Sequence, residues 1–250
     1  MRITTKVLSS SALALLLLTS SGLAQAGTVT SSPDSSKELR SSALIHVPST
    51  EASDAEQSIS AYQEEVEELY AEGDIIAFSP TAPEGSKFFA GEVASDLDSL
   101  HHDSSTSTTP ESNLYLNPIK IGLCNAGREN TVVYTIRNSK HNGNIDLKCG
   151  NKDNGYVHIR SRHEGDWNNA KGGFAGYWDD FMLYSTINAL QAPSYSRQQN
   201  STTRCYVTPI QVFKKVNRKP VYQKTIYPRV AVSTNNRKVI TSFPTGNKTC

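Results

Sequence analysis

The 250-residue chain carries a formal net charge of +1, and this value averages two oppositely charged segments. Residues 27–110 contain 16 Asp and Glu against 3 Lys and Arg, a net charge of −13, whereas residues 111–250 contain 8 against 20, a net charge of +12. The apolar run at residues 12–18 is far shorter than the roughly 20 residues that span a bilayer, which argues against a membrane anchor. The charge split is typical of a protein that interacts with nucleic acid or a membrane surface. An ordinary basic domain beside a solvated acidic linker is the simpler alternative.

The first 26 residues have the pattern of a secretory signal peptide. Arg2 and Lys6 form a short positive region, residues 12–18 (ALALLLL) the apolar region, and residues 24–26 (AQA) a small-x-small cleavage site. We therefore expect a secreted, extracellular protein whose mature chain begins near Gly27.

The four cysteines are Cys124, Cys149, Cys205 and Cys250. In an oxidising compartment an even number favours disulfides, and the absence of a CxxC spacing argues against zinc. Four cysteines allow three pairings; we favour Cys124–Cys149 with Cys205–Cys250, since the second bond would hold the C-terminus in place.

Residues 27–110 are expected to form an acidic, largely disordered pro-segment or linker, because Ser, Thr, Asp and Glu predominate. Within this segment Ile59, Tyr62, Val66 and Leu69 recur at helical spacing among glutamates, which predicts a short amphipathic helix over residues 58–72. An acidic segment next to a basic domain also suggests intramolecular masking of the basic surface.

Residues 111–250 have the length of one domain and a pattern that predicts an α+β fold. Short strands are expected at residues 119–123, 131–137 and 145–149, with a turn at 142–144. A helix is expected at residues 177–190, ended by Pro193. The segments 204–214, 221–234 and 238–243 then predict an antiparallel three-strand meander, in which Pro209 and Pro228 mark bulges or edge positions. The expected fold has one or two helices packed on a mainly antiparallel sheet that ends in this meander.

The segment 156–167 (YVHIRSRHEGDW) is the strongest candidate for a functional site. Imidazole exchanges protons near neutral pH, and guanidinium holds a phosphate through two hydrogen bonds. RNA cleavage without a metal requires a base for the 2′-hydroxyl, an acid for the leaving 5′-oxygen, and positive charge on the phosphorane. His158 and His163 are candidates for the base and acid, and Arg160 and Arg162 for the phosphate contact. A structural histidine beside surface ion pairs is the alternative.

The geometry of this segment depends on its secondary structure. In a helix, His158 and Arg162 share one face; in a strand, His158, Arg160 and Arg162 do. In both cases an arginine lies beside His158, so we favour His158 over His163.

Other candidates lie in the predicted meander. Thr241 and Ser242 present hydroxyls that could bond a phosphate oxygen, although ordinary strand residues would look the same. Basic and aromatic residues for substrate binding are Lys214, Lys215, Arg229, Tyr206 and Tyr227.

Four sequence elements resemble those of the barnase–EndoU–colicin–RelE superfamily of toxin nucleases. They are LKCGN at residues 147–151, GYVHIRSRH at 155–163, Trp167, and VITSFP at 239–244. The resemblance covers residues 114–250 and implies a metal-independent ribonuclease with a helix-then-sheet α+β fold. It places an HI-x-x-RH element at residues 158–163 and a Thr or Ser before an aromatic-Pro pair at 241–244. Many members have Gly after this element, whereas this chain has Glu164.

These observations favour a secreted, toxin-like ribonuclease with an RNA substrate and no cofactor or metal. An inhibitor protein is a further candidate partner. One alternative is a secreted module that binds RNA or anionic polymers without cleaving them. The other is a DNase, for which the acids near the motif, Asp153, Glu164 and Asp166, are few.

Overall fold

The computed structural model describes residues 49–83, 87–90, 116–173 and 176–250. All of them belong to one unit, which spans Ile45–Cys250. The predicted signal peptide lies outside the described residues.

The described residues contain five helices and nine strands. The helices are α1 (Ser49–Ser60), α2 (Gln63–Leu69), α3 (Pro118–Asn125), α4 (Gly155–Lys171) and α5 (Trp178–Gln191). The strands are β1 (Ile75–Phe78), β2 (Phe88–Ala90), β3 (Val132–Ser139), β4 (Gly143–Lys148), β5 (Tyr195–Asn200), β6 (Thr203–Val207), β7 (Ile210–Val216), β8 (Lys219–Ser233) and β9 (Lys238–Thr245).

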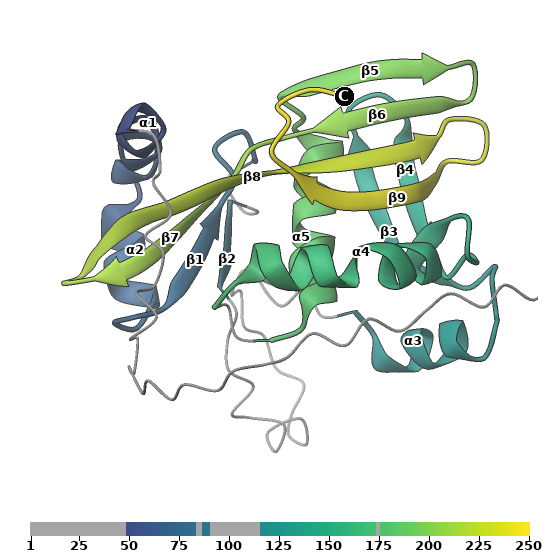
Figure 1. The fold of residues 1–250 in the computed structure, drawn as a ribbon, viewed down its shortest axis with the longest axis horizontal. Helices are drawn as coiled ribbons and strands as arrows, with labels where there is room; N and C mark the ends of the chain where they lie inside the picture. Colours follow the sequence, from purple (N-terminus) through teal and green to yellow (C-terminus); the bar gives the residue numbers. More distant parts are fainter. Residues whose placement is uncertain (1–48, 84–86, 91–115, 174–175) are drawn as a thin grey trace, which may run out of the picture. The chain divides into compact units, whose positions relative to one another are not determined.

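The described strands form one mixed, mainly antiparallel sheet with helices packed on it (Figure 1). Its main path runs β2-β1-β7-β8-β9-β4-β3, and β6 joins β8 and carries β5. Among the described pairs, the short contact of β4 with β9 is the parallel one. The predicted α+β fold class is therefore confirmed, and the described helices outnumber the one or two that were expected.

The meander is organised around β8, a strand of 15 residues. One side of β8 pairs with β7 and then with β6, and the other side pairs with β9. The segment predicted as a single strand, 204–214, is divided between β6 and β7 at Pro209, whose nitrogen has no hydrogen to donate. Pro228 lies within β8, opposite Pro244 of β9. The predicted three-strand meander is confirmed with this division.

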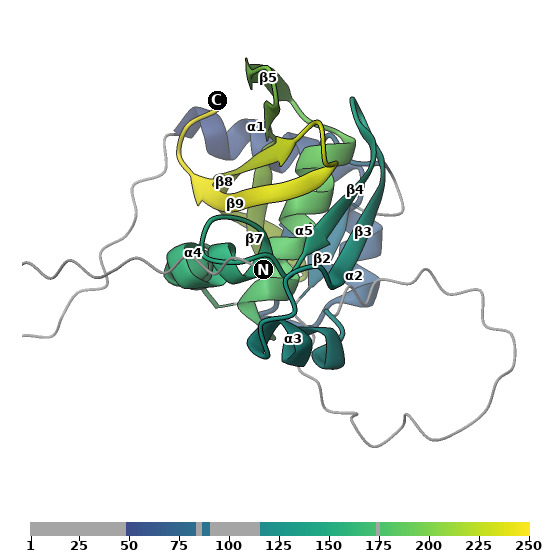
Figure 2. The same ribbon diagram turned by 90° about the vertical axis from the view of Figure 1, so that its right-hand side faces the viewer.

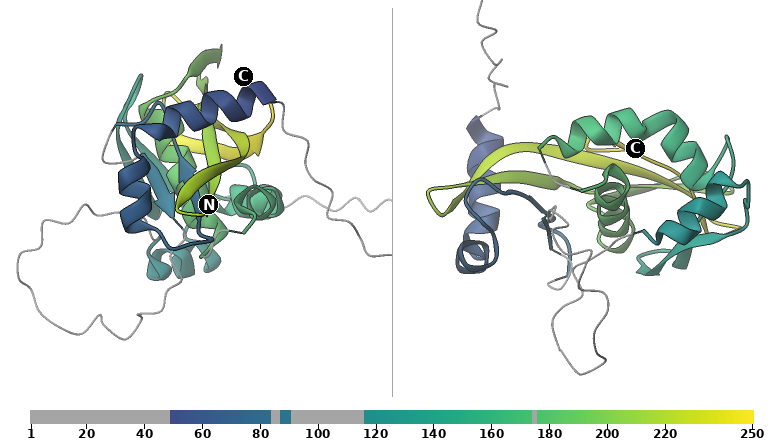
Figure 3. Two further views of the ribbon diagram at one scale, coloured as in Figure 1. Left: turned by 90° about the vertical axis from the view of Figure 1, so that its left-hand side faces the viewer. Right: turned by 90° about the horizontal axis from the view of Figure 1, so that it is seen from below.

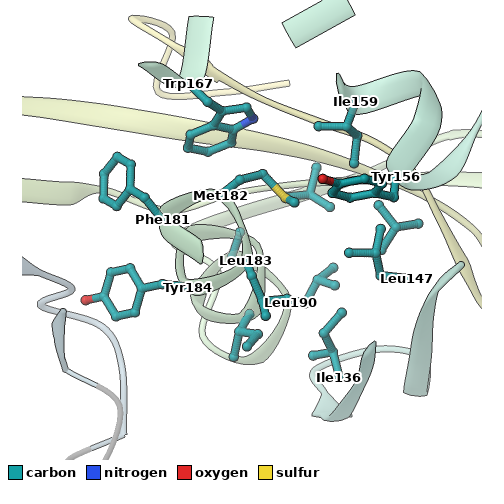
Figure 4. Packing of buried hydrophobic residues seen from close by; sticks show 14 of the residues in the cluster. Ile136, Leu147, Tyr156, Ile159, Trp167, Phe181, Met182, Leu183, Tyr184 and Leu190 are labelled. Atoms are coloured by element: carbon teal, nitrogen blue, oxygen red, sulfur yellow. The ribbon is translucent and has the colours of Figure 1, made fainter. Parts of the chain in front are cut away.

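Helix α5 lies in the main core of the unit. Every residue of α5 from Trp178 to Leu190 except Asp179 is buried. Figure 4 shows Tyr156, Ile159 and Trp167 of α4 directed toward the side chains of α5. The helix predicted at residues 177–190 is confirmed, and it holds α4 against the sheet.

The acidic N-terminal region is ordered where the structure describes it, in contrast to the expected disordered segment. Helices α1 and α2 and strands β1 and β2 belong to the same unit as the rest of the described chain (Figure 3). The predicted helix over 58–72 is instead two helices, α1 and α2. They enclose a second core of Ala55, Ile59, Val66, Ile76, Phe78, Phe213 and Tyr222. Because β7 and β8 supply part of this core, the local sequence alone did not reveal it.

The strand predicted at residues 119–123 is wrong, because these residues form part of α3. The side chain of Asn117 caps this helix by accepting hydrogen bonds from the backbone N–H groups of Ile119 and Lys120. Pro118 occupies the first helical position, where its missing N–H costs nothing. The cap and the proline outweigh the strand-like alternation. The other two strands, predicted at 131–137 and 145–149, correspond to β3 and β4.

Both predicted disulfides are present. Cys124 of α3 is bonded to Cys149, and Cys205 of β6 is bonded to Cys250. The first bond joins α3 to the chain between β4 and α4. The second holds the C-terminus against the meander.

Candidate active site

The candidate segment 156–167 lies within α4, so the helical alternative holds. Gly155 begins this helix with a φ of +78°, and an added Cβ would lie 2.6 Å from the carbonyl oxygen of Lys148. Only glycine allows so close a passage from β4 into the helix. Tyr156, Ile159, Trp167 and Ala170 then face the core, which directs the remaining side chains toward the surface.

Helix α4 lies alongside β9 (Figures 1 and 2). The indole Nε1 of Trp167 donates a hydrogen bond of 3.0 Å to the carbonyl oxygen of Ser242. This bond fixes the position of α4 along the strand and satisfies a carbonyl of β9. The side chains one turn before Trp167 are thereby placed beside the end of β9.

His158 is half-buried, and its ring is held by the backbone. Its Nδ1 lies 2.8 Å from the carbonyl oxygen of Lys152. A carbonyl oxygen only accepts, so Nδ1 carries the hydrogen and Nε2 of the neutral ring is left as an acceptor.

His163 has the larger set of contacts. Its Nδ1 lies 2.9 Å from Oδ2 of Asp166, one helical turn further on, and its side chain is 21% exposed. Its ring stacks on that of Phe243 with a centroid distance of 4.8 Å and an interplanar angle of 21°. The rings of His158 and His163 meet edge to face at 5.8 Å. The two histidines therefore form one group, in which each Nδ1 already has a partner.

Arg229 extends this group from β8. It pairs with Phe243 across the two strands, and its guanidinium carbon lies 6.0 Å from the centre of the phenyl ring. Arg229 is half-buried, and no acidic side chain among the described residues forms an ion pair with it. The ring of Phe243 thus lies between the imidazole of His163 and the guanidinium of Arg229.

The two arginines of the motif lie elsewhere. Arg160 donates from Nη1 to Oδ1 of Asn125 and lies over the ring of Tyr156, so it connects α4 to α3. Arg162 is exposed and makes no ion pair with the described residues. The structure therefore does not bring Arg160 to the histidines, and it leaves Arg162 beside them at the surface of α4.

The two hydroxyls predicted on β9 do not face solvent. Ser242 is fully buried, and its Oγ lies 2.8 Å from Oγ1 of Thr186 in α5. The Oγ1 of Thr241 is also buried and has no hydrogen-bond partner. The prediction that these hydroxyls contact a phosphate is therefore corrected, because the core covers Ser242 and the Oγ1 atom of half-buried Thr241 is inaccessible to solvent.

The predicted substrate-binding residues separate into three groups. Lys215 is buried, and its ammonium donates to the carbonyl oxygens of Glu67 and Tyr70, so it is not available to a ligand. Tyr206 is likewise buried, and its hydroxyl accepts a hydrogen bond of 2.7 Å from Asn142. Lys214 is exposed on β7, and Tyr227 is half-buried beneath the ammonium of Lys248. Arg229 is the one of the five that lies beside the histidine pair.

Sequence reasoning did not assign Asp166 or Phe243 to the site. The spacing of Asp166 from His163, three residues on a helix, is a signal that could have identified the pair. The contact of Phe243 with His163 depends on the packing of α4 against β9. Phe243 was noted only within the resemblance.

No family model, curated protein or solved structure matches the chain. Within residues 49–83, 87–90, 116–173 and 176–250, no group of three or more His, Cys, Asp or Glu side chains is arranged to hold a metal ion. No described helix is both long and apolar enough to cross a membrane.

Proposed function

We propose that this protein is a secreted, toxin-like, metal-independent endoribonuclease that cleaves RNA through attack of the 2′-hydroxyl on the adjacent phosphate. The observation that carries this proposal is the pair formed by His158 and His163, whose ring centres lie 5.8 Å apart. Each Nδ1 has a protein partner, so each Nε2 is left for substrate. Two groups that each reach an oxygen of one phosphate must lie within roughly 8 Å of each other.

His158 acts as the general base. The carbonyl oxygen of Lys152 holds the hydrogen on Nδ1, which leaves the lone pair on Nε2. That nitrogen takes the proton of the 2′-hydroxyl as its oxygen attacks phosphorus. The bond from phosphorus to the 5′-oxygen then breaks, leaving a 2′,3′-cyclic phosphate.

His163 acts as the general acid and gives a proton from Nε2 to the leaving 5′-oxygen. Its ion pair with Asp166 exists when the ring is protonated, which is the form that an acid requires. The stacked ring of Phe243 limits rotation of the imidazole. Asp166 is therefore a positioning residue for this acid.

Arg229 supplies positive charge to the phosphorane. It is half-buried and has no acidic partner among the described residues. A bound phosphate would therefore neutralise its charge without displacing another carboxylate. Guanidinium offers two parallel hydrogen bonds to phosphate oxygens. Exposed Arg162 is placed to attract the RNA backbone to α4.

The reaction class can be tested with the full mature chain and an oligodeoxynucleotide that contains one ribonucleotide. We expect a cut only after the ribonucleotide, a 2′,3′-cyclic phosphate at the new end, and an unchanged rate in EDTA. The matched control is the same oligonucleotide with deoxyribose at that position, which should stay intact. Cleavage of the control, or loss of activity in EDTA, would favour a DNase.

A non-catalytic module that binds RNA or anionic polymers is the main competitor, because it would use Arg229 and Arg162 without the histidines. Gel-shift and cleavage assays on the same RNA separate the two functions. We expect His158→Ala to bind RNA as the wild type does and to lose cleavage. Binding by the wild-type protein without any cleavage would establish the competitor.

Masking of the basic surface stays a prediction. The acidic residues of 49–83 that contact basic groups do so at the β7–β8 hairpin and at Lys248, not at the histidines. Residues 27–48 and 91–110 lie outside the described residues. Because β1 pairs with β7, a chain cut at residue 111 would lose part of its sheet, so the test requires full-length charge variants. Replacing Glu92, Asp96, Asp98 and Asp103 by their amides should raise cleavage at low salt, and an unchanged rate would refute masking.

A further inference from the structure

The path of described strands ends at β3 (Figure 2). Residues of this strand line a groove of about 580 Å³. Strand β3 pairs with β4 on one side and ends the sheet path on the other. Eight residues line the groove, among them Val133, Thr135 and Arg137 of β3, Lys120 of α3, and Ile187 and Gln191 of α5. It therefore combines a strand edge that pairs with no other described strand and side chains from α3 and α5.

Two backbone carbonyl groups at this edge of β3 accept hydrogen bonds, and in both cases the donor is a side chain. The carbonyl oxygen of Val133 accepts from Nζ of Lys120 at 3.3 Å, and that of Arg137 accepts from Nε2 of Gln191 at 2.9 Å. Alternate residues of a strand point their backbone groups to the same side, so those of Thr135 face the groove as well. Lys120 and Gln191 have flexible side chains that an incoming strand can displace.

The groove has a basic character. Lys120 lies toward one end and Arg137 toward the other, and none of the eight lining residues is acidic. The acid bonded to a lining residue, Asp146, accepts a hydrogen bond of 2.8 Å from the hydroxyl of Thr135. Ile187 and the buried Val133 add apolar surface.

We propose that the edge of β3 binds an extended, acidic segment of a partner protein, which adds a strand to the sheet. Backbone hydrogen bonds at Val133, Thr135 and Arg137 give the affinity, and the two basic side chains select acidic residues. The stretch from Val133 to Arg137 spans roughly 14 Å, the length of a strand of about five residues. This surface is separate from the histidine pair, and the proposal does not depend on the ribonuclease function.

The test uses an acetylated, amidated heptapeptide in which glutamate alternates with valine, added to the ¹⁵N-labelled mature chain. We expect amide shifts confined to β3, the end of α5 and Lys120, and slower hydrogen exchange at the amide of Thr135. The double variant Lys120→Glu, Arg137→Glu should bind at least tenfold more weakly. The matched control Lys152→Glu, Lys219→Glu makes the same change of charge at exposed positions outside the groove and should bind as the wild type does.

Five results would overturn the proposal. They are the absence of shifts at millimolar peptide, equal binding of a peptide with lysine in place of glutamate, equal weakening by the control variant, unchanged hydrogen exchange at Thr135 despite binding, and a dimer that pairs through β3 in sedimentation without peptide. In the last case the groove is an interface between two copies.

Discussion

The β7–β8 hairpin and the surface of α4 beside β9 are both rich in charge, but they use it differently. At the hairpin, the carboxylate of Glu72 accepts hydrogen bonds from the backbone N–H groups of Arg218 and Asn217. These bonds, chiefly the one from Arg218, lower the pKa of Glu72 below its ordinary value. The ammonium of Lys215 is likewise bound to carbonyl oxygens at the end of α2. The charges of the hairpin therefore fasten the N-terminal helices to the sheet.

The surface of α4 has charges without such partners. Arg229 and Arg162 form no ion pair with described residues, and the Nε2 atoms of His158 and His163 make no hydrogen bond within the described part of the chain. Basic residues therefore serve structure at the hairpin, whereas Arg229 and Arg162 beside α4 lack an acidic partner among the described residues, as the proposed RNA contact requires. The net charge of residues 111–250 alone did not distinguish basic residues with a structural role from those proposed to bind RNA.

The largest effect expected outside the histidine pair concerns Arg229. Removing a preorganised donor to the transition state costs about 10²–10³-fold in rate, so Arg229→Ala should lower kcat/KM for RNA by that factor. Arg237→Ala, at an exposed turn, is the matched control and should change the rate by less than about threefold. Equal effects of the two variants would assign Arg229 to general attraction of RNA.

A second effect concerns Asp180, a buried carboxyl in the first turn of α5 that is 4% exposed. Burial raises the pKa of Asp180 to about 6. A hydrogen bond from the backbone N–H of Leu116 lowers this pKa, but burial has the larger effect. The folded state thus binds this proton more tightly than the unfolded state, whose pKa is near 3.8. The associated stability is complete below about pH 4 and is lost as pH rises through about 6, by up to about 3 kcal/mol.

Urea unfolding of Asp180→Asn from pH 4 to pH 7 measures this contribution. The variant should lose the decline of stability over this range and be more stable than the wild type at pH 7. Asp153→Asn, whose side chain is 71% exposed, is the control. A parallel pH dependence in Asp180→Asn and the wild type would refute the assignment.

A smaller effect is expected at the hairpin. Lys215→Met keeps the apolar stem but leaves the carbonyl oxygens of Glu67 and Tyr70 without their donor, which should cost about 2 kcal/mol in urea unfolding. Lys214→Met at the exposed neighbouring position should stay within about 0.5 kcal/mol of the wild type. Neither variant should alter RNA cleavage when the protein is folded. Loss of cleavage in Lys214→Met would instead support its predicted contact with substrate.

Features encoded by local periodicity could be predicted from the sequence. The helix at 177–190 and the strands of the meander follow from such periodicity, and the disulfide pairing was favoured among three because the second bond would hold the C-terminus. Features that depend on distant segments could not. The apolar residues of α1 and α2 pack on Phe213 and Tyr222, far along the chain. Lys215 lies on the same face of β7 as Phe213, and this face is buried because α1 and α2 pack on it, which the sequence of β7 alone would not reveal.

The candidate site shows the same division. The sequence motif predicted His158 and His163 as site residues. The three-residue spacing of Asp166 from His163 on a helix would have been enough to predict Asp166 as well. The approach of Arg229 and Phe243 depends on the register of β8 with β9 and on the position of α4. The burial of Ser242 depends on the packing of α5 against β9.

The most direct test of the account is a double-mutant cycle on RNA cleavage by the full mature chain. His158→Ala and His163→Ala should each lower kcat by about 10²–10⁴-fold, because each removes one proton transfer of the same turnover. The kcat of the double variant should be only slightly lower than that of the less active single variant, since the effects of groups that act as a unit are not additive. His141→Ala, outside the pair, should cleave at the wild-type rate. A folded single variant with unchanged kcat, or losses that multiply in the double variant, would contradict the account.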